Sequence, residues 1–265
     1  MAVNAPLSAV AQSPKKVQVI STWVTSASYR QFINEIVHRA RAQQSAYVCF
    51  ANVHMLMEAY YDPEFSCVVN QADLVAPDGR PLSVLMRLQY GLRQDRVCGM
   101  DLLPDLLRTA AAQDLSVYFY GSTQETLDAI QRRLEQEHPT LRIAGLESPP
   151  FRPLTVEEDR AAVERINASG AHLVFVSLGC PKQERWMADH RGQVHACMLG
   201  LGQAFLTYAG TEKRLPRWAR DFALEWAYRL YLEPKRLWRR YLLGNTWFLY
   251  NAIISVVRSR VRVLK

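Results

Sequence analysis

The sequence predicts a doubly wound α/β domain with a mostly parallel, Rossmann-like sheet, followed by a basic helical appendage. From Val17 to Gly210, short apolar runs alternate with segments of helical spacing, and the connecting loops are short. Several runs are apolar without interruption, which is typical of strands buried on both faces of a parallel sheet. After Gly210 the pattern changes to helix after helix. We therefore expect a disordered segment over 1–16, an α/β domain carrying the site over 17–210, and a basic, aromatic tail over 211–265.

The first half of the α/β domain is expected to contain three strands and four helices. The strands are 17–20, 46–51 and 74–76; the helices are 27–42, 53–60, 81–90 and 101–113, with a further helical turn over 65–71. Thr25 or Ser26 is expected to cap the first helix and Asn52 the second, because their side chains accept hydrogen bonds from free N–H groups. Asp101 suits the N-cap or first turn of its helix.

The second half continues the same alternation. Strands are expected over 115–120, 141–146, 172–178 and 194–199. Helices are expected over 124–137 and 155–169. A third helix should run from the Gly179–Gln183 loop to His190, and a short one should follow Gly202. Thr155 and Glu158 have the spacing of a capping box. Pro181 suits the first position of its helix.

Composition limits the class of protein. With 265 residues, 49% of them hydrophobic, the chain can bury one large core or two small ones. The five Cys are scattered without a CxxC pair, which argues against a disulfide framework or a zinc site and for reduced thiols in a cytosol. No signal peptide and no membrane-spanning run is apparent, so we expect a cytoplasmic location.

Charge is concentrated in the tail. The formal net charge is +7, but residues 211–265 hold 13 Lys and Arg against 4 Asp and Glu, which leaves the remainder at 19 against 21. Four of the six Trp also lie in the tail, which Pro234 and Gly244 are expected to divide into separate helices. Basic residues interleaved with aromatic ones favour a polyanionic surface, either nucleic acid or an anionic membrane. The arginines singled out are Arg214, Arg217, Arg229, Arg236, Arg239 and Arg240.

A candidate active site centres on Asp78 and Arg96. Asp78 stands in a Pro-Asp-Gly turn directly after a strand, and Arg96 lies in the next loop, just before a helix. In an open α/β sheet, ligands bind beyond the carboxyl ends of the strands. One carboxylate and one cation at that edge could act as a base and a charge stabiliser, although Pro-Asp-Gly is also a common surface turn.

Two further strand–loop–helix turns are candidate anion sites. Gly121 and Ser122 precede one helix, while Gly179, Lys182 and Gln183 begin another, where free N–H groups favour phosphate. Cys180 fits a small packing residue better than a nucleophile. The sequence has no GxGxxG, no P-loop, no Asp-x-Asp and no metal-ligand spacing, so we expect no metal and no cofactor, with any diphosphate neutralised by Arg, Lys and helix N-termini.

Seven ordered motifs resemble the WecG/TagA/CpsF family of bacterial glycosyltransferases, over roughly Val17 to Leu249. They are NVHMLMEAYYDPEF, NQADLVAPDGRPL, RVCGMDLLPDLL, FYGST, SPPFRPLTVEED, VFVSLGCPKQERWMADHR and LEWAYRLYLEPKRLWRRYLLGN. The resemblance implies an inverting, metal-independent transferase that moves a hexose from a UDP-sugar to a polyprenyl-diphosphate-linked sugar, in cell-surface or exopolysaccharide synthesis. It also implies a peripheral protein on the inner face of the plasma membrane. The basic tail is then expected to bind the anionic lipid surface and not nucleic acid.

The resemblance also implies roles for particular residues. Asp78 corresponds to the proposed general base and Arg96 to the arginine that stabilises the leaving diphosphate, while the tail arginines correspond to a segment that closes over the site and docks on the membrane. The positions implied in substrate or nucleotide binding are Asn52, Gly79, Asp101, Gly121, Ser122, Gly179, Lys182 and Gln183.

Two departures from the family pattern bear on the donor sugar. Phe50 stands where family members have a polar pocket residue, and Leu206 stands where they have Asp. The identity of the donor hexose is therefore left open between N-acetylmannosamine, glucose and related hexoses. The acceptor sugar and the oligomeric state are left open as well. The alternative functions are a UDP-sugar- or lipid-binding family member without turnover, and a basic module that binds nucleic acid.

Overall fold

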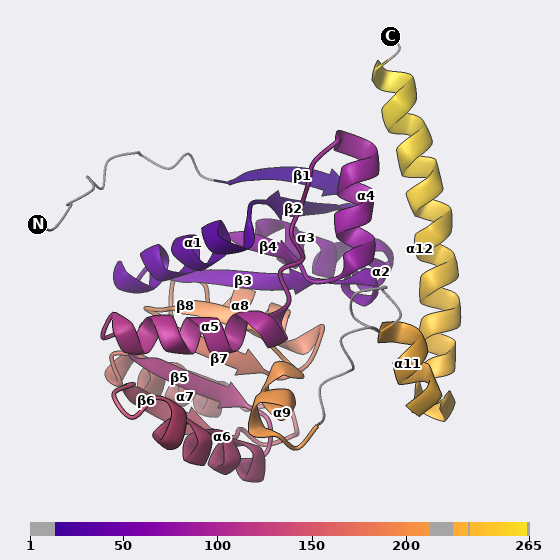
Figure 1. Ribbon diagram of the computed structural model, residues 1–265. Coiled ribbons are helices and arrows are strands. Elements are labelled where there is room, and N and C mark those ends of the chain that lie inside the picture. The colour runs from indigo at the N-terminus through magenta and orange to yellow at the C-terminus, as the bar shows by residue number, and fades with distance from the viewer. Residues whose placement is uncertain (1–13, 213–224, 233, 264–265) are drawn as a thin grey trace, which may run out of the picture.

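The computed structural model describes residues 14–212, 225–232 and 234–263. It confirms the α/β prediction: in this part of the chain a six-stranded sheet, all of it parallel, has the order β4-β3-β8-β7-β5-β6 and is covered by helices on both faces (Figure 1). Its strands are β3 Ala46–Ala51, β4 Leu74–Pro77, β5 Val117–Gly121, β6 Ile143–Glu147, β7 Leu173–Ser177 and β8 Cys197–Gly200.

The helices follow the strands in the expected alternation. They are α1 Tyr29–Arg41, α2 Val53–Tyr61, α3 Pro63–Gln71, α4 Arg80–Tyr90, α5 Gly99–Ala112, α6 Gln124–Glu137, α7 Val156–Ala168, α8 Lys182–Asp189, α9 Ala204–Ala209, α11 Glu225–Leu232 and α12 Pro234–Val263. Two predicted caps are confirmed: Asn52 accepts from Met55 N, and Thr155 forms a capping box with Glu158.

The sheet separates two hydrophobic cores. Along β3 the side chains alternate: Val48 and Phe50 face one core, which α1, α5, α6 and α9 cover, whereas Tyr47 and Cys49 face the other. The second core lies under α2, α3, α4, α7 and α8, and α12 packs on it through Phe248. The unbroken apolar runs in the sequence are therefore explained by burial on both faces.

A β-hairpin replaces the single strand expected over 17–20. Its strands, β1 Lys15–Val19 and β2 Thr22–Ser26, pair antiparallel around a turn in which Ile20 has a positive φ of 59°. Thr25 is thus a strand residue, and its hydroxyl accepts a hydrogen bond from Val75 N of the edge strand β4 (2.9 Å). The hairpin protects an edge that would otherwise present free N–H groups. The cap of α1 is Ser28, in a capping box with Gln31.

Two boundaries differ from expectation. The helix α5 begins at Gly99, which places Asp101 in its first turn and leaves Cys98 as the N-cap. Gly244 does not divide the tail, because α12 runs through it from Pro234 to Val263. Glycine inside a helix costs about 1 kcal/mol, and Gly244 is buried against Met57 of α2, whose Sδ would lie at an ordinary contact distance of 3.6 Å from an added Cβ. Of the segment 1–16, which was expected to be disordered, residues 1–13 lie outside the described part of the chain. Its last residues, Lys15 and Lys16, belong to the strand β1.

Candidate active site

The carboxyl edge of the parallel sheet collects most of the residues singled out from the sequence. Asn52 follows β3, Asp78 follows β4, Ser122 follows β5 and Gly179 lies just beyond β7. Because the strands are parallel, these positions lie at the same edge of the sheet. Figure 1 shows α11 and the start of α12 on the side toward which the arrowheads of these strands point. This is the edge at which α/β proteins bind ligands.

Asp78 and Arg96 are joined through the backbone. Asp78 N donates to Ala51 O (2.9 Å), and Arg96 Nε donates to Asp78 O (3.0 Å). Val97 N donates to Pro77 O (2.9 Å), so the loop before α5 runs alongside the end of β4. Both side chains are half-buried. The structure thus brings the predicted carboxylate and cation into one local unit.

Cys98 lies against the same carboxylate. Burial is the main cause that raises the pKa of the Cys98 thiol, and the negative charge of Asp78 and a hydrogen bond to its carboxylate raise it further. The thiol is therefore held neutral, as a donor beside Asp78. This contact could not be predicted from the sequence, because Cys98 and Asp78 are brought together only by the packing of α5 on the sheet.

Three other predicted residues lie at the starts of helices around this pair. Asn52 caps α2, with Oδ1 accepting from Met55 N (3.1 Å), and Gly79 is the N-cap of α4. Asp101 stands in the first turn of α5, with its backbone N–H bonded to Cys98 O (3.0 Å). The helices α2, α4 and α5 therefore begin at the edge that holds Asp78.

Phe50, expected in place of a polar pocket residue, is a core residue here. Its side chain is 5% exposed, and its ring lies 3.9 Å from where a Cβ on Gly99 would be. Leu201 would be still closer to such a Cβ, at 3.1 Å. Phe50 thus forms an apolar floor beneath the start of α5. Leu206 lies half-buried on α9.

The loop after β5 adopts strained backbone geometry. Gly121 has φ 110° and Ser122 has φ 66°, and a Cβ on Gly121 would lie 2.4 Å from Ser177 O. Only glycine fits such a close approach. Ser122 N donates to Ser177 O (2.9 Å), and Thr123 caps α6, so the predicted Gly-Ser-Thr turn is a tightly held loop at a helix start.

The loop after β7 differs from expectation in two side chains. Pro181 is the N-cap of α8 rather than its first residue, which is the exposed Lys182. The Gln183 amide points inward: Nε2 donates to Gly200 O (3.0 Å) and to Glu184 Oε1 (2.7 Å), and the residue is 5% exposed. Gln183 thus connects α8 to the end of β8 in this structure.

Glu184 is a buried acid that the sequence did not single out. It is 0% exposed, and Oε2 has no nitrogen or oxygen partner among the described residues. Burial raises the pKa of its carboxyl, while hydrogen bonds from Gln183 and Cys180 oppose that rise. An acid in the first turn of a helix normally suggests a solvated charge near the positive helix end, so nothing in the local sequence pointed to burial.

Replacing Glu184 with Gln is expected to change how stability depends on pH. The folded state holds this proton above the ordinary pKa of 4.5, so the carboxyl stabilises the fold most below that pH and loses its contribution as pH rises through the folded pKa. From pH 4.5 to 8, the melting temperature of the wild type should therefore fall relative to that of Glu184→Gln. Thermal unfolding at several pH values measures this, with the exposed Glu64→Gln as control. Parallel curves for wild type and Glu184→Gln would contradict it.

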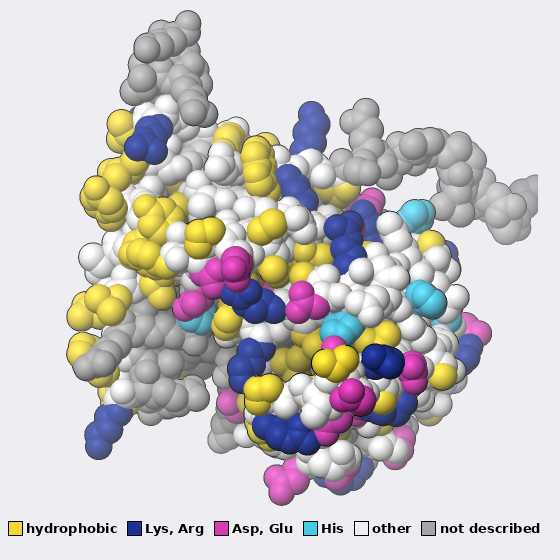
Figure 2. All heavy atoms as spheres, turned by 180° about the vertical axis from the view of Figure 1, so that it is seen from behind, with side chains coloured by type: hydrophobic (Ala, Val, Ile, Leu, Met, Phe, Trp, Pro, Cys, Tyr) yellow, Lys and Arg dark blue, Asp and Glu magenta, His cyan; other side chains and the backbone are white. Residues whose placement is uncertain are grey.

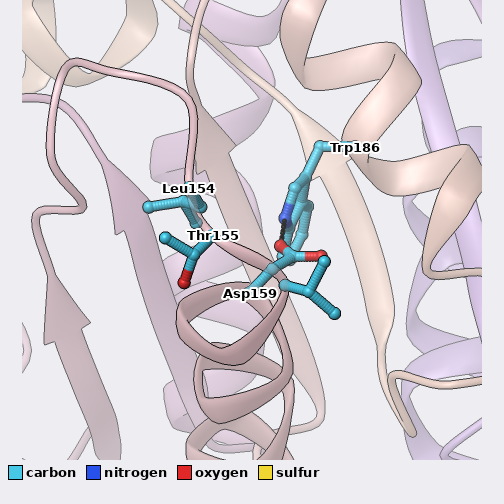
Figure 3. Close-up of a pocket in the computed structure, with 5 residues that line it drawn as sticks. Leu154, Thr155, Asp159 and Trp186 are labelled. Carbon is cyan, nitrogen blue, oxygen red and sulfur yellow. Dashed lines mark hydrogen bonds between the residues drawn. The ribbon is translucent and has the colours of Figure 1, made fainter.

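A surface hollow of about 270 Å³ lies between the first turn of α7 and α8 (Figure 3). It is lined by Leu154, Thr155, Val156, Asp159 and Trp186. The Asp159 carboxylate is already engaged, by Trp186 Nε1 (3.0 Å) and by His190 Nε2 (2.9 Å). None of the predicted site residues lines this hollow, so we do not assign the reaction to it.

The tail arginines fall into two groups. Arg214 and Arg217 lie outside the described residues, whereas Arg229 is on α11 and Arg236, Arg239 and Arg240 are on α12, with their side chains outside the described part. None of the helices described by the structure is long and apolar enough to span a membrane. Among the same residues, no group of three or more His, Cys, Asp or Glu is arranged to hold a metal ion.

The arrangement defines a class of protein: a doubly wound α/β protein with one carboxylate and one arginine at the carboxyl edge, flanked by glycine-bearing loops. Comparison with known proteins agrees. The profile of the Glycosyl transferase WecG/TagA/CpsF family matches residues 17–262. The chain belongs to this family of glycosyltransferases.

Several relatives carry a more specific name, N-acetylglucosaminyldiphosphoundecaprenol N-acetyl-beta-D-mannosaminyltransferase. The protein of that name from Bacillus spizizenii (strain ATCC 23059 / NRRL B-14472 / W23) is 33% identical over 200 residues, 75% of this chain and 76% of its own. That from Bacillus subtilis (strain 168) is 29% identical over 198 residues, 74% and 75% of the two chains. That from Staphylococcus aureus (strain NCTC 8325 / PS 47) is 27% identical over 229 residues, 85% of each.

Proposed function

We propose that this glycosyltransferase moves a hexose from a UDP-sugar to a polyprenyl-diphosphate-linked sugar, with inversion and without a metal. The observation that carries the proposal is the Asp78–Arg96 unit at the carboxyl edge, in which Arg96 Nε bonds to Asp78 O. The names of the relatives support N-acetylmannosamine as the donor sugar and an undecaprenyl-diphosphate-linked N-acetylglucosamine as the acceptor. Glucose or a related hexose remains in the proposal because Leu206 departs from the family pattern.

The proposed reaction is a single displacement. The acceptor hydroxyl oxygen attacks the anomeric carbon, the bond from that carbon to the diphosphate oxygen breaks, and UDP leaves. Asp78 takes the hydroxyl proton, which a half-buried carboxylate at the edge can do. Arg96 stabilises the charge that grows on the leaving diphosphate, an interaction that is stronger in the transition state than in the substrate.

The test is UDP release from a panel of UDP-sugars in the presence of EDTA, with N-acetylglucosaminyl-diphosphate-lipid as acceptor. We expect acceptor-dependent release with one UDP-hexose, and an inverted linkage in the product by NMR. Donor binding in calorimetry without release under any acceptor would favour the alternative, a binding protein without turnover.

We further propose that the protein works as a peripheral protein on the inner face of the plasma membrane, with α12 as its contact. One face of α12 packs on α2 and α4 through Phe248 and Trp247. The outward face carries a stripe of exposed apolar residues, at the edge that α12 forms in Figure 2: Trp238, Leu242, Leu243, Leu249, Tyr250, Ile253 and Val257. Such a stripe on a helix of a basic tail suits an anionic lipid surface.

Ile253→Glu is expected to weaken binding to vesicles that contain phosphatidylglycerol by roughly tenfold or more. The reason is the loss of an apolar side chain that the bilayer would bury, worth about 1.5–3 kcal/mol, and the repulsion of the new charge. Ile253 is 65% exposed, so folding should not change. Sedimentation with vesicles measures it, with Val156→Glu on α7, 69% exposed, as the matched control. Equal loss in both variants would argue against a role of α12.

A further inference from the structure

Three loops at the carboxyl edge meet at Ser177, the last residue of β7. The parallel ladders end there: Gly121 pairs with Ser177, and Val176 pairs with Gly200. Beyond those pairs the strands continue into loops, of which the turn after β8 is still bonded to β7 by Leu201 N and Gly202 N, which donate to Val176 O (2.9 and 3.2 Å). Ser177 makes two hydrogen bonds at this point: its carbonyl bonds to the loop after β5, and its hydroxyl bonds to the turn after β8.

The first bond reaches the loop after β5. Ser177 O accepts from Ser122 N (2.9 Å), directly beneath Gly121, whose missing side chain permits the approach. Ser122 keeps a φ of 66°, a region that side-chain-bearing residues rarely adopt. Strain of this kind persists only where the surroundings enforce it, and it clusters at functional sites.

The second bond reaches the turn after β8. The Ser177 hydroxyl donates to Gly202 O (2.9 Å), and Gly202 has a φ of 49°. Gly202 also faces Gln183, whose Oε1 would lie 3.3 Å from an added Cβ, and Gln183 Nε2 donates to Gly200 O (3.0 Å). The Ser177 hydroxyl therefore bonds to the turn after β8, and Gln183 of α8 bonds to the residue at which β8 ends.

We propose that Ser177 is a positioning residue for the donor diphosphate, fixing the loop after β5 and the turn after β8 on either side of the loop that begins at Gly179. This rests on the proposed function, because a single diphosphate must contact loops from neighbouring strands at once. Backbone N–H groups in left-handed turns and at helix starts bind such anions only where their spacing is fixed. The ligand class is a nucleoside diphosphate, and Ser177 acts on it through the loops.

The experiment compares two serines with the same kind of bond. The Ser116 hydroxyl donates to Gly170 O (2.8 Å) at the opposite, amino-terminal edge of the sheet. Ser177→Ala and Ser116→Ala each remove one hydroxyl bond to a backbone oxygen, and Ser116→Ala also removes the contact of the hydroxyl with His172 Nδ1 (2.7 Å), so both should lower the melting temperature, Ser116→Ala at least as much. Only Ser177→Ala should weaken UDP binding in calorimetry, on the order of five- to tenfold, and raise KM for the UDP-sugar more than it lowers kcat. Ser177→Thr, which keeps the hydroxyl, should restore both.

The outcomes separate this inference from the proposed function. If wild type and Ser177→Ala bind UDP equally well, or if Ser116→Ala weakens binding as much, the positioning role is overturned and the proposed function stands. If wild type neither binds UDP nor releases it from any UDP-sugar, the proposed function fails and this inference fails with it.

Discussion

Asp78→Asn is expected to lower the turnover of sugar transfer by about 10²–10⁴-fold, the usual contribution of general acid–base catalysis. The amide keeps the size of the carboxylate but cannot accept the proton of the attacking hydroxyl. UDP-sugar binding should change little, because the proposed base contacts the acceptor rather than the nucleotide. Steady-state rates of UDP release give the first quantity and calorimetry gives the second.

The variant should fold, because the bonds that position Asp78 are made by its backbone. Its N–H donates to Ala51 O and its carbonyl accepts from Arg96 Nε. The Cys98 thiol can still donate to an amide oxygen. Asp105→Asn, on the same domain and bonded to Tyr29 Oη (2.8 Å), is the matched control and should stay within about twofold of wild type in activity. Turnover of Asp78→Asn near the wild-type value would remove Asp78 as the base.

The sheet and the residues at its carboxyl edge could be predicted because both depend on local sequence. Buried parallel strands produce unbroken apolar runs such as 46–51 and 172–178, and a residue directly after such a run must lie at the carboxyl edge. Asp78 and Gly179 were located by that rule alone. The order of strands does not follow from it, and β8 lies between β3 and β7 although it is the last strand in sequence.

What could not be predicted depends on contacts between distant segments. The strand β2 has only five residues, and Thr25 resembles a helix cap until β4 is placed beside it. Gln183 and Glu184 resemble polar residues of an exposed first turn, yet both are buried, Gln183 against Gly200 and Gly202. Phe50 suggested a changed pocket. Side chains alternate between the two faces of β3, however, and this places the Phe50 ring in the core under Gly99. Each of these positions is decided by which neighbour the fold supplies.

Arg96→Ala is expected to lower turnover by about 10²–10³-fold, the cost of removing one donor aimed at developing charge. If Arg96 stabilises the leaving diphosphate, the loss should appear in kcat more than in the KM for the UDP-sugar, because the interaction strengthens as the bond breaks. Arg96→Lys should recover only part, since a lysine lacks the planar fork of donors. Arg93→Ala, an exposed arginine of the same loop, is the control and should remain near wild type.

The bond from Arg96 Nε to Asp78 O raises a second explanation for such a loss: Arg96 could act only by holding the loop that presents the base. A double-mutant cycle separates the two. If Arg96 only positions Asp78, Asp78→Asn/Arg96→Ala should be no slower than Asp78→Asn, because nothing is left to position. If Arg96 also acts on the leaving group, the double variant should be slower than Asp78→Asn by at least tenfold. We expect the second result, because the proposed function assigns Arg96 to the charge that develops on the leaving diphosphate.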